Sequence, residues 1–175
     1  MRNRGRIYAF DIHDDRIARL KELLERTGVT IAKVFKEDAR RAPEILYEEV
    51  ADRVLLDPLC SSTEAIAKHP EARWRLDEEK LRGLVKLQEE LLEVALRLAK
   101  PGGRILYTVC SVLPEEGEYL VRRFLEKHRS EVKLVPLTGP FGSGLLPGTM
   151  RAWPHRHGTT GFFYALFEKQ PRSSP

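Results

Sequence analysis

The sequence has 175 residues, 42% of them hydrophobic, with 30 Lys and Arg against 26 Asp and Glu and a formal net charge of +4. This length suits one domain with its own core and excludes a large multidomain protein. No apolar run approaches the roughly 18 residues that a membrane-spanning helix needs, and the apolar stretch at 7–10 is too short for the core of a signal peptide. We therefore expect a soluble, cytoplasmic protein with no membrane partner.

The composition also indicates redox state and source. The two cysteines, Cys60 and Cys110, are too few for a disulfide scaffold, which favours reduced thiols. Charged residues make up 32% of the chain, and it has one Asn and two Gln, a combination typical of thermophilic proteins. The small positive balance is compatible with a nucleic-acid partner, but intermixed charges are more typical of an ordinary solvated surface.

The first predicted elements are three strands and a helix. Residues 6–12 form a β-branched and aromatic run that predicts a strand ending at Asp11, and apolar residues at helical spacing then predict a helix that ends near Gly28. Residues 30–36 and 53–56 predict two further strands, which end shortly before Asp38 and Asp57.

The strongest helix prediction lies between Asp77, a capping candidate, and Lys100, with apolar residues at helical spacing between them. Gly102 and Gly103 then indicate a tight turn from this helix into the next strand. The remaining predicted elements are a strand over 104–109, a helix from Pro114 to about His128, and strands over 132–137 and 162–168. The polar residues 170–175 predict a disordered tail.

Strands that alternate with helices predict a parallel α/β sheet, in which ligands bind at the carboxyl ends of the strands. Residues capable of chemistry follow these strand ends, namely Asp11, Asp38, Asp57, Cys60 and Cys110. Each has an ordinary explanation alone, since such a Cys is usually a small buried residue and such an Asp usually forms a turn or caps a helix. Five at the predicted edge of one sheet indicate a common site.

Three motifs occur in order along the chain. They are DPLCSST at 57–63, YTVCSVLPEE at 107–116, and PHRH at 154–157 followed by GFF at 161–163. Over residues 6–169 this set resembles the Sun-type (Fmu-like, nucleolar-protein-like) RNA cytosine-5 methyltransferases. The resemblance implies a Rossmann-like class I methyltransferase sheet, with a partial catalytic domain over residues 1–169 and a tail over 170–175.

The resemblance implies S-adenosylmethionine-dependent methylation of cytosine carbon 5 in tRNA or rRNA. Because carbon 5 is a poor nucleophile, a thiolate must first bond to carbon 6 and push electrons onto carbon 5. By motif match, Cys110 would be this nucleophile and Cys60 would help to release the product. Asp57 would lie beside the target base and the cofactor, where it can hydrogen-bond the pyrimidine edge.

The same match assigns the other cofactor residues. Asp11 would hold the cofactor ribose, because a carboxylate accepts hydrogen bonds from two vicinal hydroxyls, and Asp38 would lie beside the adenine. A target base must be unstacked into the pocket, which favours single-stranded or loop cytosines. No metal site is implied: His155 and His157 lack a third ligand, and we expect a loop there that positions the following strand.

Several arginine-rich segments are candidates for an RNA-binding track. They are Arg2, Arg4 and Arg6; Arg40 and Arg41; Arg73 and Arg75 with Trp74; and residues 151–157 with Trp153. Such side chains contact phosphates and stack on bases in RNA-binding proteins. The alternative is a solvated surface, with Trp74 engaged in packing.

The sequence departs from the family pattern. The family's Gly-rich loop, which resembles Ala-Pro-Gly-Gly-Lys and wraps the methionine end of the cofactor, would precede residue 6 and is not in the sequence. The first, central strand of the sheet would be missing with it, which exposes two strand edges to pairing with another chain. Leu59 replaces the usual Pro, Val109 the usual Thr, and Glu64 stands where a Gly is common.

Three explanations of the missing loop remain open. The start lies inside a longer reading frame, or the chain is half of a split enzyme completed by self-association or a partner chain, or it is a relative that no longer binds cofactor. The alternative from another functional class is a non-catalytic RNA-binding or scaffold subunit. A generic thiol enzyme using Cys110 is less favoured, because no His follows a strand end to act as its base.

Overall fold

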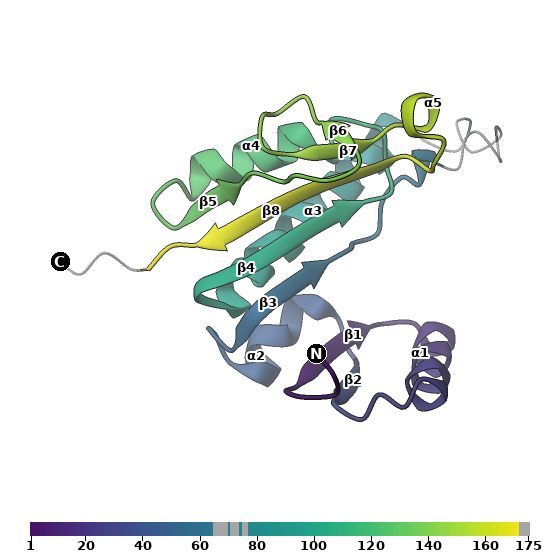
Figure 1. Cartoon of the computed structure of the whole chain (residues 1–175), viewed down its shortest axis with the longest axis vertical. Helices are drawn as coiled ribbons and strands as arrows, with labels where there is room; N and C mark the ends of the chain where they lie inside the picture. Colours follow the sequence, from purple (N-terminus) through teal and green to yellow (C-terminus); the bar gives the residue numbers. More distant parts are fainter. Residues whose placement is uncertain (65–69, 71–73, 75–76, 172–175) are drawn as a thin grey trace. The chain divides into compact units, whose positions relative to one another are not determined.

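The computed structural model describes residues 1–64, 70, 74 and 77–171, so Arg73 and Arg75 of the predicted RNA track lie outside the described residues. The packing of the main chain divides the protein between Tyr47 and Glu48 into two compact units, which we describe separately. Figure 1 shows the course of the chain. Within the described residues, no helix combines the length and the apolar character needed to cross a membrane.

The first unit is built on two parallel strands and the helix that joins them. Its elements are β1 (Ile7–Asp11), α1 (Asp14–Arg26), β2 (Ala32–Lys36), the short 3-10 helix η1 (Ala39–Arg41) and α2 (Ala42–Leu46). Asp14 and Asp15 place negative charge in the first turn of α1, where it interacts favourably with the positive end of the helix dipole. Gly28 follows the helix in the left-handed conformation, with φ +67°. The predicted order of strand, helix and strand is confirmed.

The second unit contains a mixed sheet. Its strands are β3 (Ala51–Leu56), β4 (Ala99–Val109), β5 (Val132–Val135), β6 (Gly142–Ser143), β7 (Met150–Ala152) and β8 (Phe162–Lys169). They follow the order β3-β4-β8-β7-β6, and β5 also pairs with β8 (Figure 1). The prediction of parallel strands is correct for β3 and β4 and wrong for the two closing strands, since β8 runs antiparallel to both β4 and β5. The short strands β6 and β7, which the sequence analysis does not predict, are antiparallel too, because short connections join β6 to β7 and β7 to β8.

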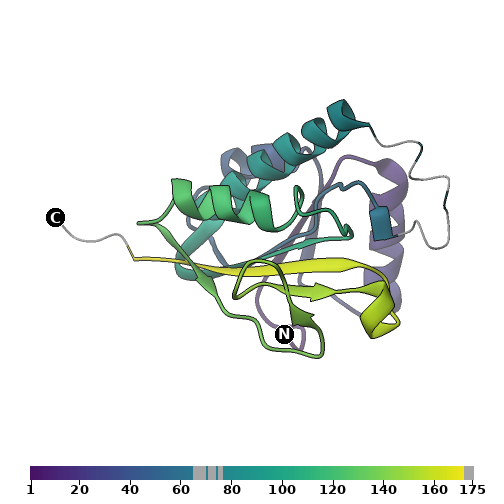
Figure 2. The ribbon, with the colours of Figure 1, turned by 90° about the horizontal axis from the view of Figure 1, so that it is seen from above.

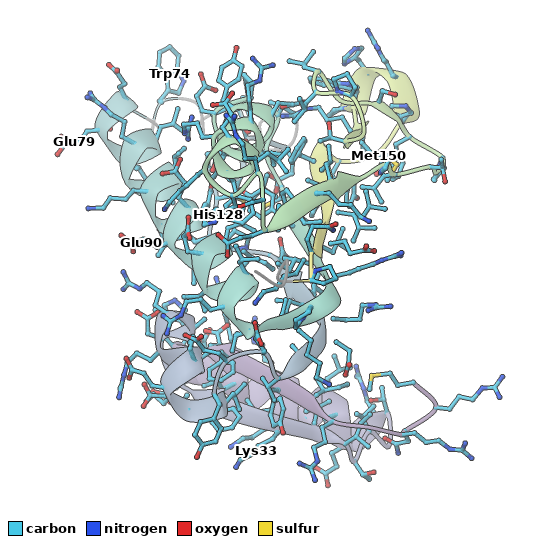
Figure 3. The ribbon with its side chains drawn as sticks, turned by 90° about the vertical axis from the view of Figure 1, so that its left-hand side faces the viewer. Lys33, Trp74, Glu79, Glu90, His128 and Met150 are labelled. Atoms are coloured by element: carbon cyan, nitrogen blue, oxygen red, sulfur yellow. The ribbon has the colours of Figure 1, made fainter. Side chains whose placement is uncertain are left out.

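Two helices, α3 (Glu78–Leu98) and α4 (Glu118–Lys127), cover one face of this sheet (Figure 2). The Asp77 side chain caps α3 by accepting the main-chain N–H of Lys80 at 2.7 Å. Beneath the helices, β8 alternates along its length, and Phe163, Ala165 and Phe167 enter the core. Glu79 and Glu90 project outward from α3, whereas His128 lies beside this helix (Figure 3).

Three predicted features differ from the structure by more than a shift of one or two residues at a strand end. The helix expected from Pro114 begins at Glu118, because Pro114 accepts the N–H of Gly117 in a turn. β4 begins directly after α3, so the two glycines expected in a tight turn lie within an irregular part of this strand, where Gly102 has φ +74°. Instead of a loop, residues Pro154–His157 form the short helix α5, whose first residue is a proline with a favourable fixed φ.

Each unit has strands with a free edge. Among the described strands, β1 and β2 pair only with each other, β3 pairs only with β4, and β6 pairs only with β7. A sheet from which one strand is missing leaves such edges, and their unpaired main-chain groups can pair with a further strand.

Candidate functional site

The two predicted thiols come together at the carboxyl edge of the second unit's sheet. β3 and β4 are parallel neighbours, so the loops that carry Cys60 and Cys110 start side by side. The two Sγ atoms lie 2.6 Å apart, beyond the roughly 2.05 Å of a disulfide bond, and both cysteines are free. Cys60 is buried, whereas Cys110 is partly exposed. The structure therefore unites two residues that are fifty positions apart in the sequence.

The ionisations of these two thiols are linked. The hydrogen bond with Cys110 lowers the pKa of Cys60 against the opposing effect of burial. The same hydrogen bond raises the pKa of Cys110, and burial and the charge of Cys60 act in the same direction. The first proton of the pair is therefore lost more easily than that of an isolated thiol, and the second with more difficulty. After the first loss, the Cys110 thiol can donate to a Cys60 thiolate.

Cys60 also has an acceptor for its proton when it is not ionised. Its Sγ lies 3.7 Å from the main-chain oxygen of Cys110 and can donate a hydrogen bond to it. The proton of the pair can therefore reside on either sulfur, because each location has a hydrogen-bond acceptor.

A buried carboxylate joins the two cysteine loops. Glu116, with no exposed surface, accepts hydrogen bonds from the main-chain N–H of Ser61 at 2.8 Å and from its hydroxyl at 2.5 Å. Gln88 of α3 donates to the same carboxylate at 2.9 Å and to the Leu59 carbonyl at 3.0 Å. The Tyr107 hydroxyl donates to the Glu116 carbonyl at 2.7 Å. The three bonds to the side chain compensate for burying this carboxylate, and the bond from Tyr107 holds its main chain.

A cluster of hydroxyl groups adds further links between the loops. The Ser111 hydroxyl lies 3.2 Å from that of Ser61 and 3.0 Å from that of Thr63. Thr63 also accepts the N–H of Val112 at 3.0 Å, and Ser111 accepts the N–H of Leu113 at 3.1 Å. The main chain on both sides of the thiols is therefore held in place by bonds between the loops.

Arg151 of β7 is expected on an RNA track or on a solvated surface, and both expectations are wrong because it is fully buried. Its guanidinium donates to the carbonyls of Ser111 at 2.8 Å and Leu113 at 3.3 Å. It also pairs with Glu118 of α4, with an Nε to Oε1 distance of 2.8 Å, and lies over the ring of Phe163. Arg151 therefore supports the loop that follows Cys110 and cannot contact a phosphate.

Asp57 directly follows β3 at its carboxyl end and is exposed to solvent. Its Oδ1 accepts a hydrogen bond from the hydroxyl of Thr108 at 3.1 Å. Tyr164 of β8 pairs with Thr108 across the sheet, and burial together with the charge of Asp57 raises the pKa of the Tyr164 phenol. Asp57, Thr108 and Tyr164 are thus neighbours near the strand ends that lead to the two cysteines.

Asp11 and Asp38 belong to the first unit and lie at the carboxyl ends of β1 and β2. Asp11 Oδ1 accepts the N–H of His13 at 2.8 Å, and its side chain is partly exposed. A partly exposed carboxylate in this position suits the two hydroxyls of a ribose. Asp38 caps η1, and hydrogen bonds from the Arg40 side chain and main chain lower its pKa. Both oxygens of Asp38 accept from Arg40, so this carboxylate has less capacity left for a ligand.

Two further residues that the sequence analysis considered for RNA or metal binding interact with neighbours in the chain. Arg41 forms ion pairs with Glu37 and Glu44. His157 accepts the main-chain N–H of Trp153 at 2.8 Å and thereby caps the start of α5. Within the described part of the chain, no three His, Cys, Asp or Glu side chains gather in a way that could hold a metal ion.

Sequence reasoning did not single out Gln88, Arg151 or Glu118 as part of the site. Gln88 carries a signal, because it is a polar residue between Leu84 and Leu92 on the apolar face of α3. A polar residue in that position needs a buried partner. Arg151 and Glu118 are 33 residues apart and sit in charge-rich segments, so no pattern in the sequence connects them.

The chain resembles known RNA methyltransferases over nearly its whole length. Residues 1–168 match the family model described as 16S rRNA methyltransferase RsmB/F. Ribosomal RNA small subunit methyltransferase B of Erwinia tasmaniensis is 34% identical, over 95% of this chain and 37% of its own length. The 28S rRNA (cytosine-C(5))-methyltransferase of Mus musculus is 36% identical, over the whole of this chain and 24% of its own length.

The crystal structure of PH0851 is also similar, with 58% identity and a TM-score of 0.93 over 97% of this chain and 38% of that one. The chain thus spans well under half the length of these relatives. The class I methyltransferase fold predicted from the motifs is confirmed, and the family model covers both cysteine loops and both units. On this evidence the chain belongs to the RsmB/F family of 16S rRNA methyltransferases.

Proposed function

We propose that this chain carries the catalytic portion of an S-adenosylmethionine-dependent RNA (cytosine-5)-methyltransferase that acts on rRNA or tRNA, with residues 1–169 as one catalytic domain. The observation that carries the proposal is the pair of free thiols, Cys60 and Cys110, which lie 2.6 Å apart at the ends of two parallel strands. Family membership supports the same reaction, since relatives are named for methylation of ribosomal RNA.

Cys110 is the proposed nucleophile, because this residue is partly exposed whereas Cys60 is buried. Cys110 passes its proton to Cys60, which can then donate to the Cys110 carbonyl oxygen. The Cys110 thiolate bonds to carbon 6 of cytosine, and the electron pair of the double bond between carbons 5 and 6 moves toward carbon 5. This step makes carbon 5 nucleophilic.

The carboxylates are assigned to the base and the cofactor. Thr108 orients one oxygen of Asp57, and we assign this carboxylate to the pyrimidine edge, where a hydrogen bond favours the electron flow. When bound, S-adenosylmethionine supplies the methyl group that carbon 5 receives. Asp11 fits the ribose hydroxyls of this cofactor, and Asp38 is assigned to the adenine side.

Cys60 is assigned to the release of the product. After methylation, carbon 5 must lose its proton before the double bond re-forms and Cys110 leaves with the bonding electron pair. Cys60 can accept this proton once it has passed its own to solvent. In the adduct Cys110 has no S–H to donate, and the hydrogen bonds from the main chain and the hydroxyl of Ser62, which lower the pKa of Cys60, favour that ionisation.

The remaining properties follow from this chemistry. The target cytosine must leave its stack, so we propose a single-stranded or loop site in the RNA. Thiols that react in this way must stay reduced, so we propose the cytoplasm as the compartment. The free edges of β1 and β3 are proposed to pair with a further segment, either of a longer chain or of a partner chain, that brings the Gly-rich loop.

A trapping experiment tests the proposal. The full protein that carries this sequence is incubated with S-adenosylmethionine and RNA in which 5-azacytidine replaces cytosine, and adducts are resolved on a denaturing gel. The native protein should form a covalent adduct, and Cys110→Ala should abolish it. Cys60→Ala should instead accumulate an adduct with unmodified RNA, because release is blocked.

Two results would contradict the proposal. Absence of any adduct with the native protein, together with calorimetry that detects no S-adenosylmethionine binding, would favour the non-catalytic RNA-binding subunit. An adduct that persists in Cys110→Ala and disappears in Cys60→Ala would exchange the roles of the two thiols.

A further inference from the structure

Ser62, whose side chain lies near both thiols, has an unusual backbone conformation. Its φ is +53°, in the left-handed region that residues with a side chain seldom occupy. Backbone strain of this kind persists only where surrounding contacts enforce it, and it concentrates at functional sites. The strain at Ser62 is therefore a reason to ask what its side chain does.

The Ser62 hydroxyl lies beside both sulfurs. Its Oγ is 3.9 Å from the Sγ of Cys60 and 3.9 Å from the Sγ of Cys110, within hydrogen-bond range for sulfur. The hydroxyls of the adjacent Ser61 and Thr63 bond instead to the buried network around Glu116 and Ser111. Of these three consecutive hydroxyls, the one on the residue with positive φ contacts the thiol pair.

We propose that Ser62 is a third catalytic residue, whose hydroxyl donates a hydrogen bond to whichever of the two sulfurs carries the negative charge. The proposal rests on the proposed function, in which Cys110 and Cys60 are the reacting thiols. It adds a group that is able to serve both of them.

The proton balance is simple. The pair holds one proton and one negative charge before the attack, and the transfer of the proton from Cys110 to Cys60 moves the charge the other way. Ser62 keeps its own proton and only turns its O–H from one sulfur to the other, because both are equally distant. The hydroxyl can then stabilise the Cys110 thiolate before it attacks carbon 6 and again when it leaves.

The electrostatics of the pair agree with this role. The hydrogen bond with the Ser62 hydroxyl lowers the pKa of both thiols, whereas burial raises both. Ser62 is exposed, so a cytosine ring that approaches Cys110 also comes close to this hydroxyl.

The test compares Ser62→Ala with Ser62→Gly. Both changes remove the hydroxyl, but only glycine relieves the strain of the positive φ. The readout is the rate at which iodoacetamide alkylates Cys60 and Cys110 across a pH series, followed by peptide mass spectrometry without RNA or cofactor. Ser143→Ala, in the exposed strand β6, is the matched control.

We expect the alkylation rate to fall by the same factor in Ser62→Ala and Ser62→Gly. Alkylation near neutral pH should slow by about threefold to tenfold, and its pH midpoint should rise, because the thiolate has lost a hydrogen bond. Ser143→Ala should react like the native chain. Native rates in both Ser62 variants would overturn the proposal, as would a loss in Ser62→Ala that is absent in Ser62→Gly, since the backbone and not the hydroxyl would then be responsible.

The outcome also separates this proposal from the proposed function. A native protein that forms an RNA adduct, combined with unchanged alkylation in both Ser62 variants, would overturn only the role of Ser62. A native protein that forms no adduct would overturn the proposed function and the catalytic role of Ser62 with it, even if the variants alkylate slowly.

Discussion

Arg151 and Glu118 form an ion pair in which each side chain is only 1% exposed. The arginine also donates to two carbonyls of the loop after Cys110, so the pair links β7, α4 and that loop. Breaking one partner of a buried pair leaves the other charge without compensation.

Arg151→Met should therefore destabilise the protein strongly. Removing one partner of a buried ion pair typically costs about 3 to 5 kcal/mol, and we expect a loss of this size in the free energy of unfolding, measured with urea. Arg104→Met is the matched control, because the Arg104 ion pair with Glu168 is partly exposed and should contribute about 1 kcal/mol or less. Equal losses in the two variants would contradict the structural role of Arg151.

The pH dependence of stability should reveal Glu118. Burial raises the pKa of its carboxyl, but hydrogen bonds and the charge of Arg151 outweigh this effect and lower it. The ionised Glu118 carboxyl therefore contributes its full stabilisation above the pKa of about 4.3 that a glutamate has in the unfolded chain. This contribution disappears as the pH falls through the lower pKa that Glu118 has in the folded protein. The difference in unfolding free energy between the native protein and Glu118→Gln should shrink on acidification, measured by urea titrations at a series of pH values. A difference that stays constant would rule out this titration.

Gln88 should tolerate neither an apolar nor an acidic replacement. Gln88→Leu removes the donor to the Leu59 carbonyl and one of the three donors to the Glu116 carboxylate, and the loss of buried hydrogen bonds of this kind costs about 1 to 3 kcal/mol. Gln88→Glu places a second carboxylate beside Glu116 and should be the less stable variant at neutral pH. Thermal unfolding of both variants measures the order, and a Leu variant as stable as the native protein would show that the bonds contribute nothing.

Thr108 should matter through its hydroxyl. Thr108→Val keeps the shape of the side chain but frees Oδ1 of Asp57, so we expect the methylation rate to fall by about tenfold with little change in stability. Thr108→Ser restores a donor and should recover most of the rate. The assay follows methyl transfer to RNA under single-turnover conditions. A valine variant with native activity would mean that Asp57 needs no orientation by Thr108.

The sequence predicts the elements near the site well, because they depend on local patterns. The apolar spacing between Asp77 and Lys100 predicts α3, and β3 and β4 end before the residues expected to act. Once these strands are parallel neighbours, Cys60 and Cys110 must start from one edge, so their proximity follows from the motif positions.

What the sequence does not predict depends on contacts between distant segments. The antiparallel half of the sheet has strands of two and three residues, β6 and β7, which are too short to show a periodic pattern. Arg151 looks like a surface residue because His155 and Arg156 follow it, and only the fold places Glu118 opposite its guanidinium. The left-handed backbone at Ser62 is equally invisible, since serine has no preference for that conformation.

The pairing of Leu56 with Tyr107 determines where the two thiols meet. A slip of β3 by one residue would displace one sulfur by about 3.3 Å and turn the side chains of that strand to the opposite face. The positions of the two sulfurs at the carboxyl edge of the sheet thus depend on main-chain hydrogen bonds several residues away. A misaligned β3 would abolish activity although every reactive group is still present.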